Sequence, residues 1–141
     1  MEIKEFHAEL LEPLRKLYFE SRSSTFTWLD ARHLKLSDFE RDTEGERVWV
    51  AMESDRVVGF LSIQEPDNFI HHLYIAANSL RGGIGSTLLD MCKLNYSELS
   101  LKCLIKNQKA LHFYESQGFV KCAAGGHGDE SYYLMKFNSQ I

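Results

Sequence analysis

A cluster of glycines follows an apolar stretch in LYIAANSLRGGIGSTLLDMC, where a strand predicted at 69–76 leads into a helix predicted from Gly83 to about Asn95. Small residues let a ligand approach the backbone closely, and the free N–H groups at a helix start favour phosphate oxygens. A loop that only needs glycine for positive φ is the alternative. The predicted anion-binding cradle consists of Leu80, Arg81, Gly82, Gly83, Ile84, Gly85 and Ser86.

Two common phosphate-binding motifs are excluded by the residues around these glycines. A P-loop requires Lys-Ser or Lys-Thr directly after its last glycine, and neither follows here. A dinucleotide-binding fold requires a third glycine where this chain has Leu88, and an acidic residue near the position of Ile105. The cradle therefore belongs to another kind of anion site.

A second segment that could do chemistry runs from Asn107 to Gly118, where a helix is predicted to begin and end. Phe113 and Tyr114 lie about 100° apart on such a helix, so both cannot face the core fully. A tyrosine, with an ordinary pKa of about 10, could protonate a leaving thiolate with a pKa of about 8.5. Packing is the alternative role for Tyr114, and helix capping is the alternative for Asn107.

Two adjacent histidines, His71 and His72, lie on the predicted strand 69–76 and are candidate bases. An ammonium group with a pKa of about 10 must lose a proton before it can attack, and histidine has a suitable pKa of about 6.5. Adjacent strand residues point to opposite faces, so we expect at most one histidine to face a substrate. We favour His71, on the face of Phe69; a structural role for both is the alternative.

The remaining pattern predicts an α/β fold with a mixed sheet of about seven strands flanked by helices. An edge strand at 1–6 and a helix at 9–22 precede a segment that we expect to hold two short helical turns. Two β-branched and aromatic runs joined at Ser54-Asp55 predict a hairpin at the centre of the sheet. Strands at 99–105, 119–123 and 131–137 complete the alternation with helices.

Composition restricts the class of protein. The chain has 141 residues and a formal net charge of −4, which indicates one globular domain spanning 1–141 and argues against nucleic-acid binding. Apolar runs are too short to cross a membrane, the first residues do not resemble a secretion signal, and three cysteines without paired or metal-ligand spacing favour a cytoplasmic protein with no metal.

Charge is distributed unevenly along the chain. Residues 1–68 carry nine Lys and Arg against fifteen Asp and Glu, a balance of −6, whereas residues 69–124 have a balance of +3. This division suggests an anionic ligand beside the second block and a cationic one beside the first. An uneven solvated surface is the alternative interpretation.

Together the two motifs resemble those of the GNAT superfamily, the acyl-CoA-dependent N-acyltransferases. The family pattern [QR]-x-x-G-x-[GA] is matched in its second half by Gly83, Ile84 and Gly85, while Leu80 replaces the usual Gln or Arg and Arg81 follows one step later. The downstream pattern Asn107-x-x-Ala110-x-x-Phe113-Tyr114-x-x-x-Gly118-Phe119 is similar to the family's second motif. The resemblance spans nearly the whole chain and implies a centrally splayed sheet.

The resemblance also implies a function and roles for individual residues. Acetyl-CoA would be the cosubstrate, bound by the cradle, by backbone N–H groups of Leu73, Tyr74 and Ile75, and along Asn107, Ala110 and Phe113. Tyr114 would protonate the CoA thiolate. The reaction expected is direct acetyl transfer to a primary amine of a small molecule or a protein; a CoA-binding module without catalysis is the alternative. Relatives are often dimers.

The acceptor pocket is expected to draw on aromatic residues before the hairpin and near the C-terminus. Phe26, Trp28 and Tyr133 are the candidates, although aromatic residues are more often found in cores. Arg22 could bind a carboxylate on the acceptor or interact with a helix C-terminus. The acidic first block predicts a preference for cationic amines.

Overall fold

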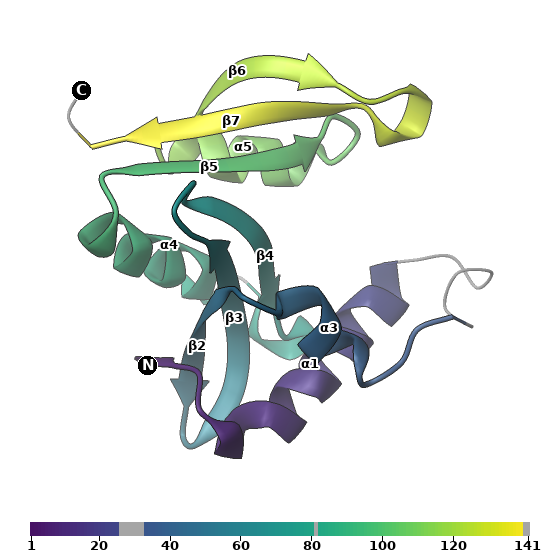
Figure 1. Ribbon diagram of the computed structural model, residues 1–141, viewed down its shortest axis with the longest axis vertical. Helices are drawn as coiled ribbons and strands as arrows, with labels where there is room; N and C mark the ends of the chain where they lie inside the picture. The colour runs from purple at the N-terminus through teal and green to yellow at the C-terminus, as the bar shows by residue number, and fades with distance from the viewer. Residues whose placement is uncertain (26–32, 81, 140–141) are drawn as a thin grey trace.

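A computed structural model describes residues 1–25, 33–80 and 82–139 (Figure 1). Short 3-10 turns at Ala8–Leu10, Ala77–Ser79 and Gly128–Glu130 connect longer elements. The strands and helices are β1 (Glu2–Glu5), α1 (Leu11–Thr25), α3 (Asp38–Thr43), β2 (Arg47–Glu53), β3 (Arg56–Gln64), β4 (Phe69–Ile75), α4 (Ile84–Asn95), β5 (Glu98–Leu104), α5 (Gln108–Ser116), β6 (Val120–Gly125) and β7 (Tyr132–Asn138).

The strands form one mixed sheet in the order β1-β2-β3-β4-β5-β7-β6, which confirms the predicted fold class. Strands β2 and β3 form the predicted hairpin, and Ser54 and Asp55 both have positive φ, as in the two-residue turns that match strand twist. The hairpin is not central, however, because β4 is the middle strand. The segment predicted to contain two helical turns includes α3, and its earlier part lies outside the described residues.

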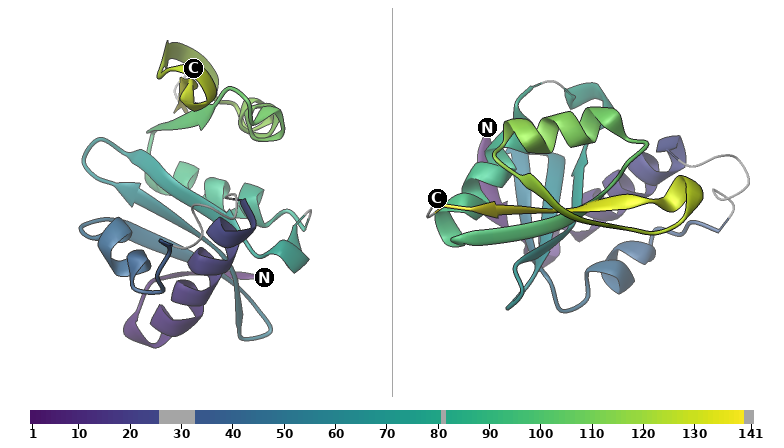
Figure 2. Two further views of the ribbon diagram at one scale, coloured as in Figure 1. Left: turned by 90° about the vertical axis from the view of Figure 1, so that its right-hand side faces the viewer. Right: turned by 90° about the horizontal axis from the view of Figure 1, so that it is seen from above.

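Helices cover both faces of the N-terminal half of the sheet (Figure 2). On one face, Leu14 and Tyr18 of α1 pack with Phe39 of α3 and Phe60 of β3. On the other, Leu88 and Leu89 of α4 belong to a larger core that includes Leu61. Because consecutive residues of β3 point to opposite faces, Phe60 and Leu61 anchor different cores, and both are fully buried. Each such side chain contributes roughly 1.5–3 kcal/mol to stability.

The sheet splits between its two central parallel strands. Strands β4 and β5 are paired only at Phe69 and Ser100 within the described residues, and beyond that point they diverge (Figure 1). The antiparallel strands β5, β7 and β6 then continue as a separate three-stranded layer with α5 against it. The central splay implied by the resemblance is therefore present.

None of the helices in the described part of the chain combines the length and apolar character needed to cross a membrane.

Candidate active site

Backbone amides of β4 face the gap that opens beside β5. The N–H of Ala76 donates to the carbonyl of Val58, at 2.8 Å, so Ala76 points toward β3. In an antiparallel ladder the backbone N–H groups of successive residues point alternately toward and away from the partner strand. The N–H of Tyr74 therefore points toward β3, and those of Leu73 and Ile75 point toward the gap. Leu73 and Ile75 are thus placed to bind a carbonyl oxygen, whereas the amide of Tyr74, predicted to do the same, is not.

Helix α4 begins beside this gap at a residue in the left-handed conformation. Gly83 is its N-cap, with φ of +76°, and its carbonyl accepts hydrogen bonds from the backbone and the hydroxyl of Thr87. The N–H groups of Ile84, Gly85 and Ser86 come before Thr87, the first residue whose N–H donates within the helix, so they stay available to an anion. The residues of the predicted cradle lie at the start of α4 and in the loop before it, except Arg81, which lies outside the described residues; that they bind an anion stays a prediction.

Close packing between α4 and α5 explains one further glycine. A Cβ on Gly85 would lie 3.1 Å from Cζ of Phe113, so the glycine lets the two helices approach. The hydroxyl of Ser86 accepts a hydrogen bond from the side chain of Gln117, at 3.0 Å. In the loop before α4, Leu80 is 60% exposed and Gly82 is exposed. Phe113 and Ser86 thus join the two predicted motifs in space.

Asn107 caps α5 through its side chain. Its Oδ1 accepts a hydrogen bond from the N–H of Ala110, at 3.2 Å, which confirms the capping alternative. Ala110 itself lies in the first turn and packs partly against the larger core. Capping fixes the start of the helix that carries Phe113 and Tyr114.

Tyr114 of α5 packs against the larger core, which includes Cys103 of β5 and against which Leu73 and Ile75 of β4 also pack. Burial raises the pKa of its phenol, and the Cys103 thiol of β5 and the Tyr74 phenol of β4 raise it further. Its ring also packs against Phe119, with centroids 5.8 Å apart. Within the described residues no hydrogen bond reaches its hydroxyl. The phenol keeps its proton through the physiological range and is available as a donor.

A β-bulge places both histidines on the same face of β4, contrary to the sequence-based prediction. His72 pairs with Ser62 and Ile70 pairs with Ile63, which leaves His71 as the extra residue without a partner on β3. The rings of His71 and His72 therefore lie together, 5.5 Å between centroids. His71 also contacts Phe69, as predicted, with centroids 5.2 Å apart.

The carboxylate of Glu46, directly before β2, lies between the two imidazoles. Its Oε2 contacts Nδ1 of His71, and its Oε1 is 3.7 Å from Nδ1 of His72. The Glu46 side chain is only 5% exposed, compared with 45% for His71. No spacing in the sequence connects residue 46 with residue 71, and their proximity depends on the pairing of the strands.

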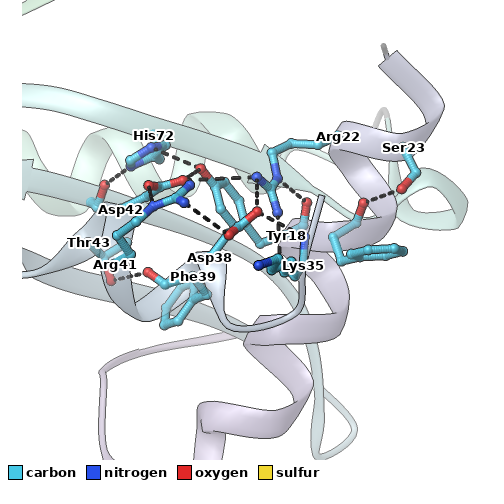
Figure 3. A network of polar contacts seen from close by, with 12 residues as sticks. Tyr18, Arg22, Ser23, Lys35, Asp38, Phe39, Arg41, Asp42, Thr43 and His72 are labelled. Carbon is cyan, nitrogen blue, oxygen red and sulfur yellow. Dashed lines mark hydrogen bonds and ion pairs between the residues drawn. The ribbon is translucent and has the colours of Figure 1, made fainter. Parts of the chain in front are cut away.

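His72 is held inside a polar network on the α1 side of the sheet (Figure 3). Its Nδ1 is 2.7 Å from the Ser62 hydroxyl, and its Nε2 is 3.5 Å from the hydroxyl of Tyr18, which donates to Asp42 at 2.6 Å. Burial lowers the pKa of His72, and the nearby Glu46 carboxylate opposes this shift. His72 is therefore neutral at neutral pH and has partners at both nitrogens.

Arg22 belongs to the same network, which contradicts its predicted role as a site for an acceptor carboxylate. Its guanidinium donates to the carboxylate of Asp38, at 3.2 Å, and to the backbone carbonyls of Tyr18 and Lys35. The Arg22 and Asp38 side chains are 7% and 5% exposed. The guanidinium also lies 3.8 Å from the ring centre of Tyr18. Arg22 thus joins α1 to α3 inside the protein.

The predicted aromatic acceptor pocket is not assembled from the described residues. Phe26 and Trp28 lie outside them. Tyr133 of β7 packs against the larger core, and the ammonium of Lys121 lies 4.7 Å from its ring centre. Tyr133 is therefore a packing residue in this structure. The side chains near the histidines instead come from α1 and α3, and Tyr18 and Asp42 were not among the predicted site residues.

Comparison with known proteins agrees with this geometry. The family model described as "Acetyltransferase (GNAT) domain" matches residues 44–121, more than half of the chain. This chain therefore belongs to the GNAT acetyltransferase family.

One curated relative is the peptidyl-lysine N-acetyltransferase YiaC of Escherichia coli (strain K12), 38% identical over 77 residues that cover 53% of this chain and 52% of that protein. The chain spans about half the length of the curated relatives that it matches.

Solved structures show the same fold at low identity. Smu.2055 from Streptococcus mutans UA159 superposes with a TM-score of 0.78 at 19% identity, covering 99% of both chains. YncA from Salmonella typhimurium, solved with its cofactor acetyl-CoA, has a TM-score of 0.74 at 15% identity and covers 99% of this chain and 94% of that one.

Proposed function

We propose that this chain transfers an acetyl group from acetyl-CoA to a primary amine by direct attack in a ternary complex. The observation that carries the proposal is the gap between β4 and β5, with the outward amides of Leu73 and Ile75 beside it and the Tyr114 side chain packed against the same core as those two residues. Membership of the GNAT family supports acetyl-CoA as the cosubstrate, and yncA was solved with that molecule.

The residues present fit this cosubstrate. The N–H groups at the start of α4 would bind the pyrophosphate, and Gly83 allows it to approach the backbone. The arm would run along α5 beside Ala110 and Phe113. The amides of Leu73 and Ile75 would bind the thioester carbonyl and stabilise the oxyanion that forms after attack.

Proton transfer would involve one residue on each side of the gap. His71 would accept a proton from the acceptor amine as the new C–N bond forms, because its Nε2 has no partner within the described residues, whereas both nitrogens of His72 do. Tyr114 would donate its hydroxyl proton to sulfur as the C–S bond breaks. Water would then return Tyr114 and His71 to their starting states.

We further propose a cationic acceptor. The acidic block at 1–68 supplies α1 and α3, which lie on the face of β4 that carries the histidines. YiaC, by its name, acts on peptidyl lysine. A lysine side chain, in a peptide or in a small molecule, is therefore the first acceptor to test.

The experiment measures free thiol released from acetyl-CoA without amine and with a panel of amines of different charge. We expect release only with amine, and faster release with a lysine peptide or a polyamine than with glutamate. A preference for acidic amino acids would contradict the cationic acceptor. Tight CoA binding without transfer to any amine would overturn catalysis and support a CoA-binding module.

A further inference from the structure

The Glu46 carboxylate stands out among the polar groups near β4. Its side chain is 5% exposed, and its Oε1 is buried without a hydrogen-bond partner within the described residues. A buried carboxylate that lacks partners is costly, so such a group is retained where its charge has a use. The groups that face it are imidazoles: His71 at Oε2 and His72 near Oε1.

The contact between Glu46 and His71 determines which nitrogen of His71 carries hydrogen. A carboxylate only accepts hydrogen bonds, so Nδ1 of His71 must donate to Oε2. In the neutral ring Nε2 then has the lone pair. The His71 side chain is 45% exposed, and within the described residues Nε2 has no hydrogen-bond partner.

The bulge on β4 is what makes this arrangement possible. If the regular pairing of His72 and Leu73 continued to residue 71, His71 would point to the α4 face, as Leu73 does, and away from Glu46. The extra residue turns His71 toward Glu46 instead. His72 stays neutral because burial lowers its pKa, so a proton taken up by His71 would not be opposed by a second positive imidazole.

We propose that Glu46 is a positioning residue, which holds His71 through Nδ1 so that Nε2 accepts the proton of the attacking amine. This inference rests on the proposed acetyl transfer. The amine loses one proton, His71 Nε2 gains it, and the resulting imidazolium is stabilised by the adjacent carboxylate. Water later removes that proton.

One test is kinetic and uses Glu46→Gln, with Glu44→Gln as the matched control, since Glu44 is an exposed carboxylate two residues away. We expect Glu46→Gln to lower kcat roughly 10- to 100-fold with little change in KM, and Glu44→Gln to change neither. In a His71→Ala background, Glu46→Gln should cause no further loss. An equal loss in both backgrounds would overturn the proposal.

A second measurement needs neither turnover nor a variant that folds. Nitrogen chemical shifts of the histidine rings in the unmodified protein, at neutral pH, should show His71 with hydrogen on Nδ1. Hydrogen on Nε2 would overturn the proposal even if the enzyme is active. Absence of acetyl transfer to any amine would refute the proposed function instead, and the ring shifts would still report on Glu46.

Discussion

Tyr114 is the residue on which the leaving-group step depends. Burial raises the pKa of its phenol, and the Cys103 thiol and the Tyr74 phenol raise it further. A protonated phenol in that position is suited to donate to a departing thiolate, and it introduces no titration below about pH 10. Other roles for the ring, such as packing against Phe119, do not need the hydroxyl.

Replacing Tyr114 with Phe should lower kcat about 100-fold, since proton donation is lost while the ring stays in place. The affinity for CoA should change little. Steady-state kinetics and a binding titration check both quantities. Tyr132→Phe is the control, because Tyr132 pairs with Leu104 on β5 and its ring contacts Lys102. Turnover in Tyr114→Phe equal to that of the control would remove the assigned role.

His72 should couple folding to pH. Its pKa is lowered in the folded state, chiefly by burial, so the unfolded chain binds the proton more readily. Its contribution to stability is therefore complete above about pH 6.5 and declines as pH falls through the lower folded pKa. Urea unfolding between pH 8 and pH 5 should show this decline in the free energy of unfolding.

The variant His72→Asn should show a weaker dependence of the unfolding free energy on pH than the unmodified chain. His127→Asn, at an exposed position, provides the control and should retain the full dependence. An identical slope in all three proteins would mean that burial of His72 does not govern this behaviour.

At the scale of elements, the start of α4 combines a backbone requirement with a binding role. Gly83 has φ of +76°, and Gly45, between α3 and β2, has φ of +78°. A Cβ at either position would contact no heavy atom within 4 Å, so each alanine would cost mainly the left-handed conformation, about 1 kcal/mol. The two positions differ in that only Gly83 borders the proposed pyrophosphate site.

We therefore expect Gly83→Ala and Gly45→Ala to destabilise the protein equally, while only Gly83→Ala weakens CoA binding, by about tenfold or roughly 1.4 kcal/mol. Thermal unfolding and calorimetric titration with CoA measure the two effects. Equal affinity in the two variants would place the pyrophosphate elsewhere.

Sequence patterns predicted most elements because their signals are local. The Ser54-Asp55 turn, the cap at Asn107 and the left-handed residues Gly83 and Gly118 each act within a few positions. The bulge at His71 was missed because it is decided by the register between β3 and β4. Two adjacent polar residues give no periodic signal that distinguishes a bulge from regular alternation.

Long-range pairing also explains the errors at the candidate site. Arg22 lies near the end of the predicted helix 9–22, where a charged side chain is usually exposed. In the structure it is buried in an ion pair with Asp38, which lies on a separate helix. Glu46 precedes a strand and has no neighbour in sequence that marks it as functional. The roles of Arg22 and Glu46 depend on contacts with residues far away in the sequence, and composition and spacing do not predict such contacts.

At the scale of the whole molecule, the division of charge along the chain follows the division into elements. The acidic block forms α1, α3 and the first three strands, and the basic block forms the elements around the gap from β4 to β6. The phosphates of CoA would bind beside the basic block, and a cationic amine would bind beside the acidic block. Long-range attraction of opposite charges would then assist both partners.

The most direct test of the account follows a lysine peptide and acetyl-CoA with this chain, measuring the acetylated peptide by mass spectrometry and the free thiol in the same sample. We predict equimolar appearance of both products, at a rate that falls sharply in Tyr114→Phe. Thiol and acetylated peptide at no more than the level without protein, despite bound CoA, would contradict acetyl transfer at the gap between β4 and β5.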